Sequence, residues 1–326
     1  MQYFIFISII NFLIIFFLKD KIAKKLNLVD KPDHVLKIHK SSVPLLGGFI
    51  LLTNSFFLLY FSITENNIYY LKIILLSFSI SLFGLIDDIK NIKPNTKIIF
   101  LTFFLTFFFF IFPDMKINSL KFLTFGLKQI NIENKYWLSL LFTVLCYLLL
   151  INAYNMCDGL DGIALFIGLV WLCYFFLKIT EINYYLISII ITLILIYYFN
   201  IRSKIFLGDS GNYYISTFAG SVLIKENNFF TNYIVEEIFI IFMLPGIDML
   251  RLFIVRIYKK KNPFIGDRNH FHHLLNNKFN KIKSILIYYL FILIPILVFK
   301  LSIISPIYVI LITIFIYIYF LKILTK

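Results

Sequence analysis

Long apolar segments recur along the whole chain of 326 residues. A helix needs about 20 predominantly apolar residues to cross a bilayer. Eleven segments approach this length, the eighth being the shortest: residues 2–18, 44–63, 68–86, 96–112, 137–152, 162–178, 183–200, 212–224, 235–257, 283–300 and 304–322. We therefore predict an all-α polytopic membrane protein with about 10–11 transmembrane helices.

The composition agrees with this class, because only 15% of the residues are charged, whereas soluble domains carry about 25%. Polar stretches are short, so residues 1–326 are predicted to form a single integral membrane domain. Segment 2–18 lacks a basic leader and a small-residue cleavage site, so we expect a retained first helix rather than a signal peptide.

The distribution of cations predicts the orientation. If the N-terminus lies outside, 23 of the 31 lysines and arginines fall on the inside and 8 on the outside. Cytoplasmic loops carry this excess in membrane proteins, so a periplasmic N-terminus in a bacterial inner membrane is expected. The same bias explains the net charge of +14 without a nucleic-acid partner. The predicted cytoplasmic loops are 19–43, 87–97, 200–211 and 258–282, and a short hairpin near 116–132 is expected outside.

The most polar element inside the apolar pattern is Asn152–Gly162, Asn-Ala-Tyr-Asn-Met-Cys-Asp-Gly-Leu-Asp-Gly. A carboxylate in bilayer hydrocarbon costs about 2.5–3.5 kcal/mol on insertion scales, so such residues belong at helix ends or in wet cavities. The side-chain oxygens suit Mg²⁺ better than zinc, and Gly159 and Gly162 would begin the next helix. The alternative is a capped turn with two solvating acids.

Three further acids are candidate catalytic or metal-binding groups. Asp87 and Asp88 begin a predicted loop that reaches Lys97, and Asp209 lies within Gly208–Gly211. Adjacent carboxylates repel each other, so a divalent cation, a lysine or a shared proton must compensate their charge. The alternatives are a polar helix end for the pair and a helix N-cap for Asp209. A lone acid in an apolar segment, Asp248, is interpreted as a packed polar residue.

Basic groups gather in two of the predicted inner loops. His39 precedes a Pro and Gly pair in the first loop, and a second group follows three lysines: Arg268, His270, His272 and His273. Arginine and histidine bind phosphate through charge-assisted hydrogen bonds. The alternatives are a loop attracted to anionic lipid and a histidine zinc site that lacks a nearby cysteine. Together the elements indicate anionic substrates, a divalent metal and phosphoryl chemistry.

In this order, the five elements resemble the polyprenyl-phosphate N-acetylhexosamine-1-phosphate transferases, the MraY/WecA superfamily, over about residues 30–275. The resemblance implies transfer of a sugar-1-phosphate from a UDP-sugar to undecaprenyl phosphate, with release of UMP. It also implies a requirement for Mg²⁺, for which Mn²⁺ can substitute. The Arg-Asn-His-Phe-His-His motif is similar to the WecA/TagO branch, so GlcNAc-1-phosphate and a role in cell-envelope polysaccharide synthesis are expected.

Two other interpretations stay open at this point. One is transfer of phospho-N-acetylmuramoyl-pentapeptide within the same superfamily. The other, from a different class, is a polytopic lipid or sugar transporter, although a transporter would place its ionisable residues near the bilayer midplane. Homodimer formation is also left open.

The resemblance implies roles for the acidic and amide residues. Asp209 is expected to bind Mg²⁺, with Asn155 close to the metal and Asn152 supporting it. Asp87 is expected to deprotonate the lipid phosphate, with Asp88 as its catalytic neighbour.

The substrate contacts are implied in the same way. Lys97 is expected to bind phosphate, and Asp161 to contact the uracil with Asp158 and Gly159 nearby. The remaining expected contacts, to phosphate or sugar, come from the basic residues His39, Arg268, His270, His272 and His273.

Overall fold

The structure, a computed structural model, describes residues 2–32, 41–124, 126–179, 183–230, 233–262 and 267–325. The chain divides into two compact units. The first comprises Met1–Lys97 and Ala164–Val222, and the second comprises Ile98–Ile163 and Leu223–Lys326. The predicted single domain stays a prediction.

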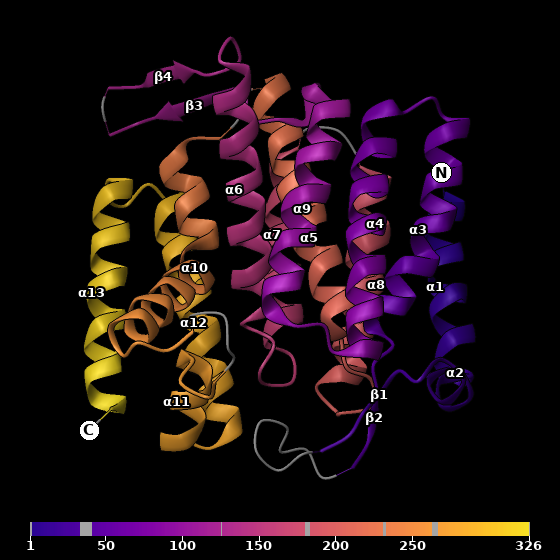
Figure 1. Ribbon diagram of the computed structural model, residues 1–326. Helices are drawn as coiled ribbons and strands as arrows, with labels where there is room; N and C mark the ends of the chain where they lie inside the picture. The colour runs from indigo at the N-terminus through magenta and orange to yellow at the C-terminus, as the bar shows by residue number, and fades with distance from the viewer. Residues whose placement is uncertain are drawn as a thin grey trace. The chain divides into compact units, whose positions relative to one another are not determined.

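The described residues form mostly helices (Figure 1). In chain order these are α1 (Gln2–Phe17), α2 (Lys19–Leu26), α3 (Gly47–Thr64), α4 (Ile68–Lys90), α5 (Pro94–Ile111), α6 (Tyr136–Asn155), α7 (Ile163–Lys178), α8 (Tyr184–Asn200), α9 (Gly208–Phe230), α10 (Val235–Tyr258), α11 (Phe271–Lys278), α12 (Lys281–Lys300) and α13 (Pro306–Leu324). A short 3₁₀ helix covers Pro113–Met115, and the strands are β1 (Val29–Asp30), β2 (Val43–Pro44), β3 (Ser119–Phe122) and β4 (Lys128–Asn131).

Each of the eleven predicted spans coincides with a helix, and only the short α2 and α11 were not predicted. Within the described ranges, seven helices are long and apolar enough to cross a membrane: α3, α4, α5, α6, α10, α12 and α13. The pair α1 and α2, bent by 74°, would be an eighth, while α7 and α8 are apolar but shorter. The all-α polytopic membrane class is confirmed, and the side on which the N-terminus lies stays a prediction.

In the first unit, α1, α3, α4 and α8 run side by side (Figure 1). A buried polar network joins three of them: the Asn54 side chain contacts Ser8, Ser188 and Thr192 at 3.0, 3.2 and 3.1 Å. Small hydroxyl and amide side chains allow close packing and hydrogen bonding between helices in an apolar environment. The network holds α1, α3 and α8 together, and none of its four residues is a predicted site residue.

Two adjacent glycines hold the start of α3 against the start of α9. The N–H groups of Gly47 and Gly48 donate to the carbonyls of Phe206 and Leu207, both at 2.9 Å. A Cβ on Gly48 would lie 1.9 Å from the Ser210 Oγ atom. Only glycine permits this approach, which fixes the backbone on both sides of Asp209.

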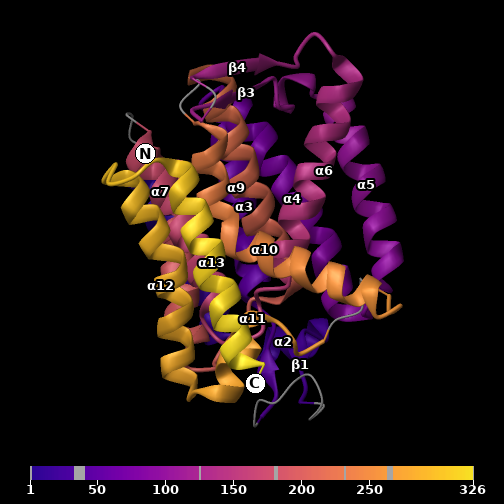
Figure 2. The same cartoon turned by 90° about the vertical axis from the view of Figure 1, so that its left-hand side faces the viewer.

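In the second unit, α12 and α13 pack against α10, and α11 contacts α12 and α13 (Figure 2). The predicted hairpin near 116–132 is confirmed as β3 paired with β4. It adjoins the Tyr136 end of α6, where a pocket of about 730 Å³ is lined partly by Lys116 and Tyr136. The 20 residues of α6 span about 30 Å, so the hairpin and the Asn152–Gly162 stretch lie at opposite ends of this helix.

Candidate active site

The first unit holds a group that we call the carboxylate cluster: Asp87, Asp88, Lys97 and Asp209. The two adjacent acids belong to the last turn of α4, which continues to Lys90. The predicted loop from Asp87 to Lys97 is therefore wrong in extent, because only residues 91–93 separate α4 from α5. Lys97 is in the first turn of α5, and Asp209 in the first turn of α9.

Lys97 joins two of the acids. Its ammonium group contacts the Asp87 carboxylate and lies 3.1 Å from Asp209 Oδ2. Asp87 is buried and also accepts the Ile92 N–H at 2.8 Å, whereas Lys97 and Asp209 keep 25% and 28% of their side chains exposed. The sequence left three ways to compensate the charge of the paired acids: a divalent cation, a lysine or a shared proton. The structure shows the lysine, Lys97. The side chains of Lys97 and Asp209 are thus partly exposed, unlike that of Asp87.

Asp88 has a different position from its neighbour. Its two oxygens accept the backbone N–H groups of Asp209 at 2.7 Å and Ser210 at 3.1 Å. A carboxylate at the start of a helix compensates unpaired N–H groups and the helix dipole. Gly208, at φ +75°, makes the approach feasible, since a Cβ there would lie 2.7 Å from Asp88 Oδ2. In this structure Asp88 therefore caps α9 and positions Asp209, and its predicted catalytic role stays a prediction.

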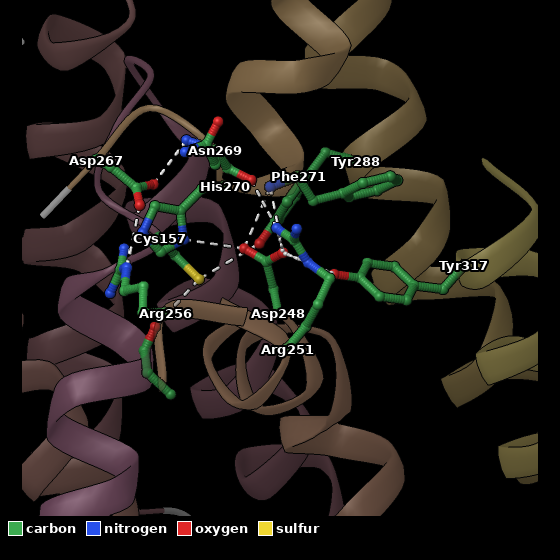
Figure 3. Close-up of polar contacts among 11 residues, drawn as sticks. Cys157, Asp248, Arg251, Arg256, Asp267, Asn269, His270, Phe271, Tyr288 and Tyr317 are labelled. Carbon is green, nitrogen blue, oxygen red and sulfur yellow. Dashed lines mark hydrogen bonds and ion pairs between the residues drawn. The ribbon is translucent and has the colours of Figure 1, made fainter. Parts of the chain in front are cut away.

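The second unit holds a group that we call the histidine cluster: Asp248, Arg251, Arg268, His270, His272 and His273. His270 directly precedes α11, and His272 and His273 are in its first turn. The ring of His270 contacts Asp248 through Nδ1, 3.0 Å from Oδ2, and the Phe271 N–H lies 3.2 Å from the same oxygen (Figure 3). One carboxylate of α10 thus holds both the His270 ring and the start of α11.

The sequence interpretation of Asp248 as a packed polar residue missed this role. Arg251 Nη2 lies 2.8 Å from Asp248 Oδ1, and the Tyr317 hydroxyl donates to the same oxygen at 2.6 Å. Tyr317 belongs to α13, so this contact ties α13 to α10 (Figure 3). One signal was available, because an ionisable residue inside an apolar span is by default a functional candidate.

His272 and His273 are buried against Gly159. A Cβ on Gly159 would lie 2.0 Å from His272 Nε2 and 2.8 Å from His273 Nε2. Burial lowers the pKa of His272 well below its ordinary value, and burial together with Arg268 lowers the pKa of His273 to about 4. Both rings are therefore neutral at pH 7. They cannot supply the positive charge that the sequence analysis expected of them, and any contact with a substrate would be a hydrogen bond of a neutral ring.

The Asn152–Gly162 stretch joins α6 to α7 as predicted, through a turn over residues 156–162. Gly162 adopts φ +89° and directly precedes α7, so the helix begins one residue after the start of the predicted span 162–178, and Gly159 lies in the turn before it rather than at the helix start. Asp161 pairs with Lys281 Nζ at 2.7 Å. Asn152 donates to the Leu148 carbonyl at 2.7 Å within α6.

Several predicted contacts stay predictions. Asn155 and Asp209, the predicted metal ligands, belong to different compact units, and their shared metal site stays a prediction. The uracil contact of Asp161, with Asp158 and Gly159, awaits a bound nucleotide. His39 lies outside the described residues.

Comparison with known proteins agrees with the resemblance. Residues 70–227 match the profile of glycosyl transferase family 4. An undecaprenyl-phosphate alpha-N-acetylglucosaminyl 1-phosphate transferase of Thermotoga maritima is 30% identical over 272 residues, 81% of this chain and 78% of the relative. The chain belongs to glycosyl transferase family 4. The resemblance to the polyprenyl-phosphate N-acetylhexosamine-1-phosphate transferases is thereby confirmed.

The relatives of this chain carry two different names. A protein of Escherichia coli strain K12 with the same name as the Thermotoga relative is 28% identical over 283 residues, 82% of this chain and 75% of the relative. A phospho-N-acetylmuramoyl-pentapeptide-transferase of Dictyoglomus turgidum is 30% identical over 312 residues, 90% of this chain and 92% of the relative. The family is established by these matches, and the sugar substrate is a separate question.

Two of the predicted site residues carry side chains of the chemical type that binds a magnesium ion. Within the residues that the structure describes, no group of three or more histidine, cysteine or acidic side chains is arranged to hold a metal. Mg²⁺ needs no such group, since it is commonly held by one or two carboxylates together with water and substrate phosphates. Asp209, with its partly exposed carboxylate, and the amide of Asn155 supply oxygen donors of this kind.

Proposed function

We propose that the protein transfers GlcNAc-1-phosphate from UDP-GlcNAc to undecaprenyl phosphate. The products would be UMP and undecaprenyl-diphospho-GlcNAc, the lipid carrier on which a cell-envelope polysaccharide begins. The observation that carries the proposal is the carboxylate cluster, in which Lys97 joins Asp87 of α4 to Asp209 of α9 in a family 4 chain. The relatives named as GlcNAc-1-phosphate transferases support this choice of sugar.

The reaction joins two anions, so their charge must be screened. An oxygen of the lipid phosphate attacks the phosphorus that carries the sugar, and the bond from this phosphorus to the UMP oxygen breaks. UMP leaves with the electron pair. A proton still on the lipid phosphate passes to the Asp87 carboxylate, while the Lys97 ammonium is placed to bind a phosphate oxygen.

A magnesium ion, when bound, would be held by Asp209 and Asn155 and would neutralise charge on the diphosphate. Asp88 keeps Asp209 in place by holding the first N–H groups of α9. Arg268 supplies positive charge for the diphosphate. The neutral His272 and His273 supply hydrogen bonds rather than charge.

We propose that the N-terminus is periplasmic and that the site faces the cytoplasm of a bacterial inner membrane. The charge distribution of the loops supports this orientation, and UDP-sugars are cytosolic. Cysteine labelling from outside intact cells tests it: Lys90→Cys should stay unlabelled, while Lys128→Cys in the hairpin should react. Labelling of Lys90→Cys from outside would contradict the proposal.

The activity test uses the purified chain in lipid nanodiscs with Mg²⁺ and undecaprenyl phosphate. UDP-GlcNAc, UDP-GalNAc and UDP-MurNAc-pentapeptide are offered separately, UMP release is measured, and the lipid product is weighed by mass spectrometry. We expect the GlcNAc product, dependent on Mg²⁺ or Mn²⁺ and lost in EDTA. A pentapeptide product would reassign the chain to the second candidate, which the long match to the Dictyoglomus protein favours. Release of no UMP from any donor would overturn the proposal.

A further inference from the structure

Asp248 is a buried acid in the middle of α10, a helix long and apolar enough to span the membrane. A carboxylate at such a position costs about 2.5–3.5 kcal/mol on insertion scales, so it persists only where other groups compensate it. Asp248 is 2% exposed, and its neighbours in α10 are mostly apolar. The compensation therefore has to come from particular partners.

Those partners are distributed over the two carboxylate oxygens, and one of them, the Phe271 N–H, is shared, lying 3.3 Å from Oδ1 and 3.2 Å from Oδ2. Oδ1 accepts from Arg251 Nη2 at 2.8 Å and from the Tyr317 hydroxyl at 2.6 Å. Oδ2 faces His270 Nδ1 at 3.0 Å and the Phe271 N–H at 3.2 Å. The first pair fixes the carboxylate within α10 and α13, and the second pair fixes the histidine motif to it (Figure 3).

The pairing with Arg251 decides which nitrogen of His270 carries a proton. A carboxylate paired with a guanidinium is ionised, and an ionised carboxylate only accepts hydrogen bonds. His270 Nδ1 must therefore be the donor, which leaves Nε2 as the ring atom available to another group. Among the described residues, the Nδ1 contact is the only hydrogen bond of this ring.

Two hydrogen bonds to Asp248 Oδ2, from His270 Nδ1 and from the Phe271 N–H, also fix the orientation of the His270 ring. The Phe271 N–H follows His270 directly in the chain, so Asp248 holds the backbone and the ring at once. A side chain held at two points is oriented before the substrate arrives, which is how supporting carboxylates act on histidines in metal sites.

We infer that Asp248 is a positioning residue, which fixes His270 with Nδ1 protonated and presents Nε2 to the diphosphate of the sugar donor. The inference rests on the proposed function for the identity of that ligand. Both oxygens of Asp248 are occupied by protein donors, so its effect on the reaction passes through His270. A purely structural acid would act independently of His270.

A double-mutant cycle separates the two roles. In the wild-type background, Asp248→Asn should lower kcat by about 10–100-fold, the range known for carboxylates that support histidines. In the His270→Ala background, the same change should lower kcat by less than about twofold. Equal losses in both backgrounds would overturn the inference.

The matched control is Tyr317→Phe, which removes one donor from Oδ1 and leaves the His270 contact in place. This variant should lower kcat by much less than Asp248→Asn does, because Arg251 still holds Oδ1 and the His270 contact is unchanged. A loss as large as that of Asp248→Asn would mean that the whole buried network, rather than the His270 contact, sets the rate.

A second measurement covers the case in which Asp248→Asn does not fold. ¹⁵N spectra of histidine-labelled protein in nanodiscs, assigned with His270→Gln, report which ring nitrogen is protonated. Protonated Nδ1 in the wild type is expected, and a ring protonated only at Nε2 would overturn the inference. This readout needs no turnover, so it stands apart from the proposed function, which fails on its own if wild-type protein releases no UMP.

Discussion

In the carboxylate cluster two of three acids share one lysine and the third, Asp88, holds backbone N–H groups of α9, all at the ends of helices. In the histidine cluster one acid inside a helix collects donors from α10, α11 and α13. The first arrangement has an excess of negative charge and keeps Asp209 partly exposed. The second has one acid for two arginines, and His272 and His273 are neutral. The first therefore suits a cation or a proton, and the second suits an anion.

The two clusters also differ in what holds them. The carboxylate cluster depends on backbone approach, with Gly208 admitting Asp88 to the start of α9. The histidine cluster depends on side-chain hydrogen bonds buried in an apolar environment, where a lost partner leaves an unsatisfied group. Substitutions in the first should change the chemistry with little effect on stability, while those in the second should change both.

The largest effect is expected from Asp209→Asn. The change keeps the shape of the side chain but removes a full charge from the predicted metal site, where a metal stabilises the transition state by several kcal/mol. Each 1.36 kcal/mol is about tenfold in rate, so we expect a loss of at least about 10²-fold in kcat. UMP release at several Mg²⁺ concentrations measures it, and extra Mg²⁺ should restore only part of the rate.

The control for this variant is Asp20→Asn, an aspartate in the first turn of α2 with 72% of its side chain exposed. It should leave both activity and thermal stability unchanged. If Asp209→Asn were as active as this control at limiting Mg²⁺, Asp209 would be a helix-end residue only, since Asn and Asp serve helix starts about equally well.

All four members of the carboxylate cluster were predicted from the sequence, because polar residues at the ends of long apolar segments stand out. Their secondary structure was predicted less well: Asp87 and Asp88 were expected in a loop and lie in the last turn of α4. Carboxylates are unfavourable at a helix C-terminus. The contacts with Lys97 and with the start of α9 compensate them, and such tertiary contacts have no local signal in the sequence.

The histidine cluster was predicted only in part, because its tertiary contacts also leave no local signal in the sequence. The motif from Arg268 to His273 is visible in the sequence, but its anchor Asp248 is a single acid within an apolar run. Its partner Tyr317 follows 69 residues later and resembles any other tyrosine of a membrane helix. The neutral state of His273 depends on burial, which the spacing of the motif does not reveal.

A smaller but still large effect is expected from Gly159→Ala. The added Cβ would lie 2.0 Å from His272 Nε2, so a ring or the turn has to move. Overpacking of this kind costs about 1–3 kcal/mol, and we expect a lower melting temperature together with about tenfold lower kcat. The matched control is Gly246→Ala in α10, where a Cβ would meet nothing within 4 Å. Equal stability of the two variants would contradict the packing of the histidines against Gly159.

The pH dependence of stability should come from the histidine cluster. The pKa of His273 is lowered to about 4 from an ordinary value of 6.5. Between these pH values the unfolded chain binds a proton that the folded chain does not. Stability should therefore be complete above pH 6.5 and fall progressively towards pH 4. Melting temperatures of wild type and His273→Gln across this range measure the effect; the variant should lose less stability on acidification, and identical slopes would contradict it.

The smallest effect is expected from Lys281→Ala, which removes the partner of Asp161. Lys281 is about half exposed, with 48% of its side chain accessible, and exposed ion pairs contribute at most about 1 kcal/mol. The melting temperature should therefore change little, and the difference should vanish in high salt.

If Asp161 contacts the uracil, freeing it from Lys281 should alter KM for the UDP-sugar and leave kcat unchanged. Steady-state kinetics over a range of donor concentrations distinguish the two parameters. A fall in kcat with KM unaltered would instead make Lys281 part of the transfer step, and would extend the cationic side of the histidine cluster to the start of α12.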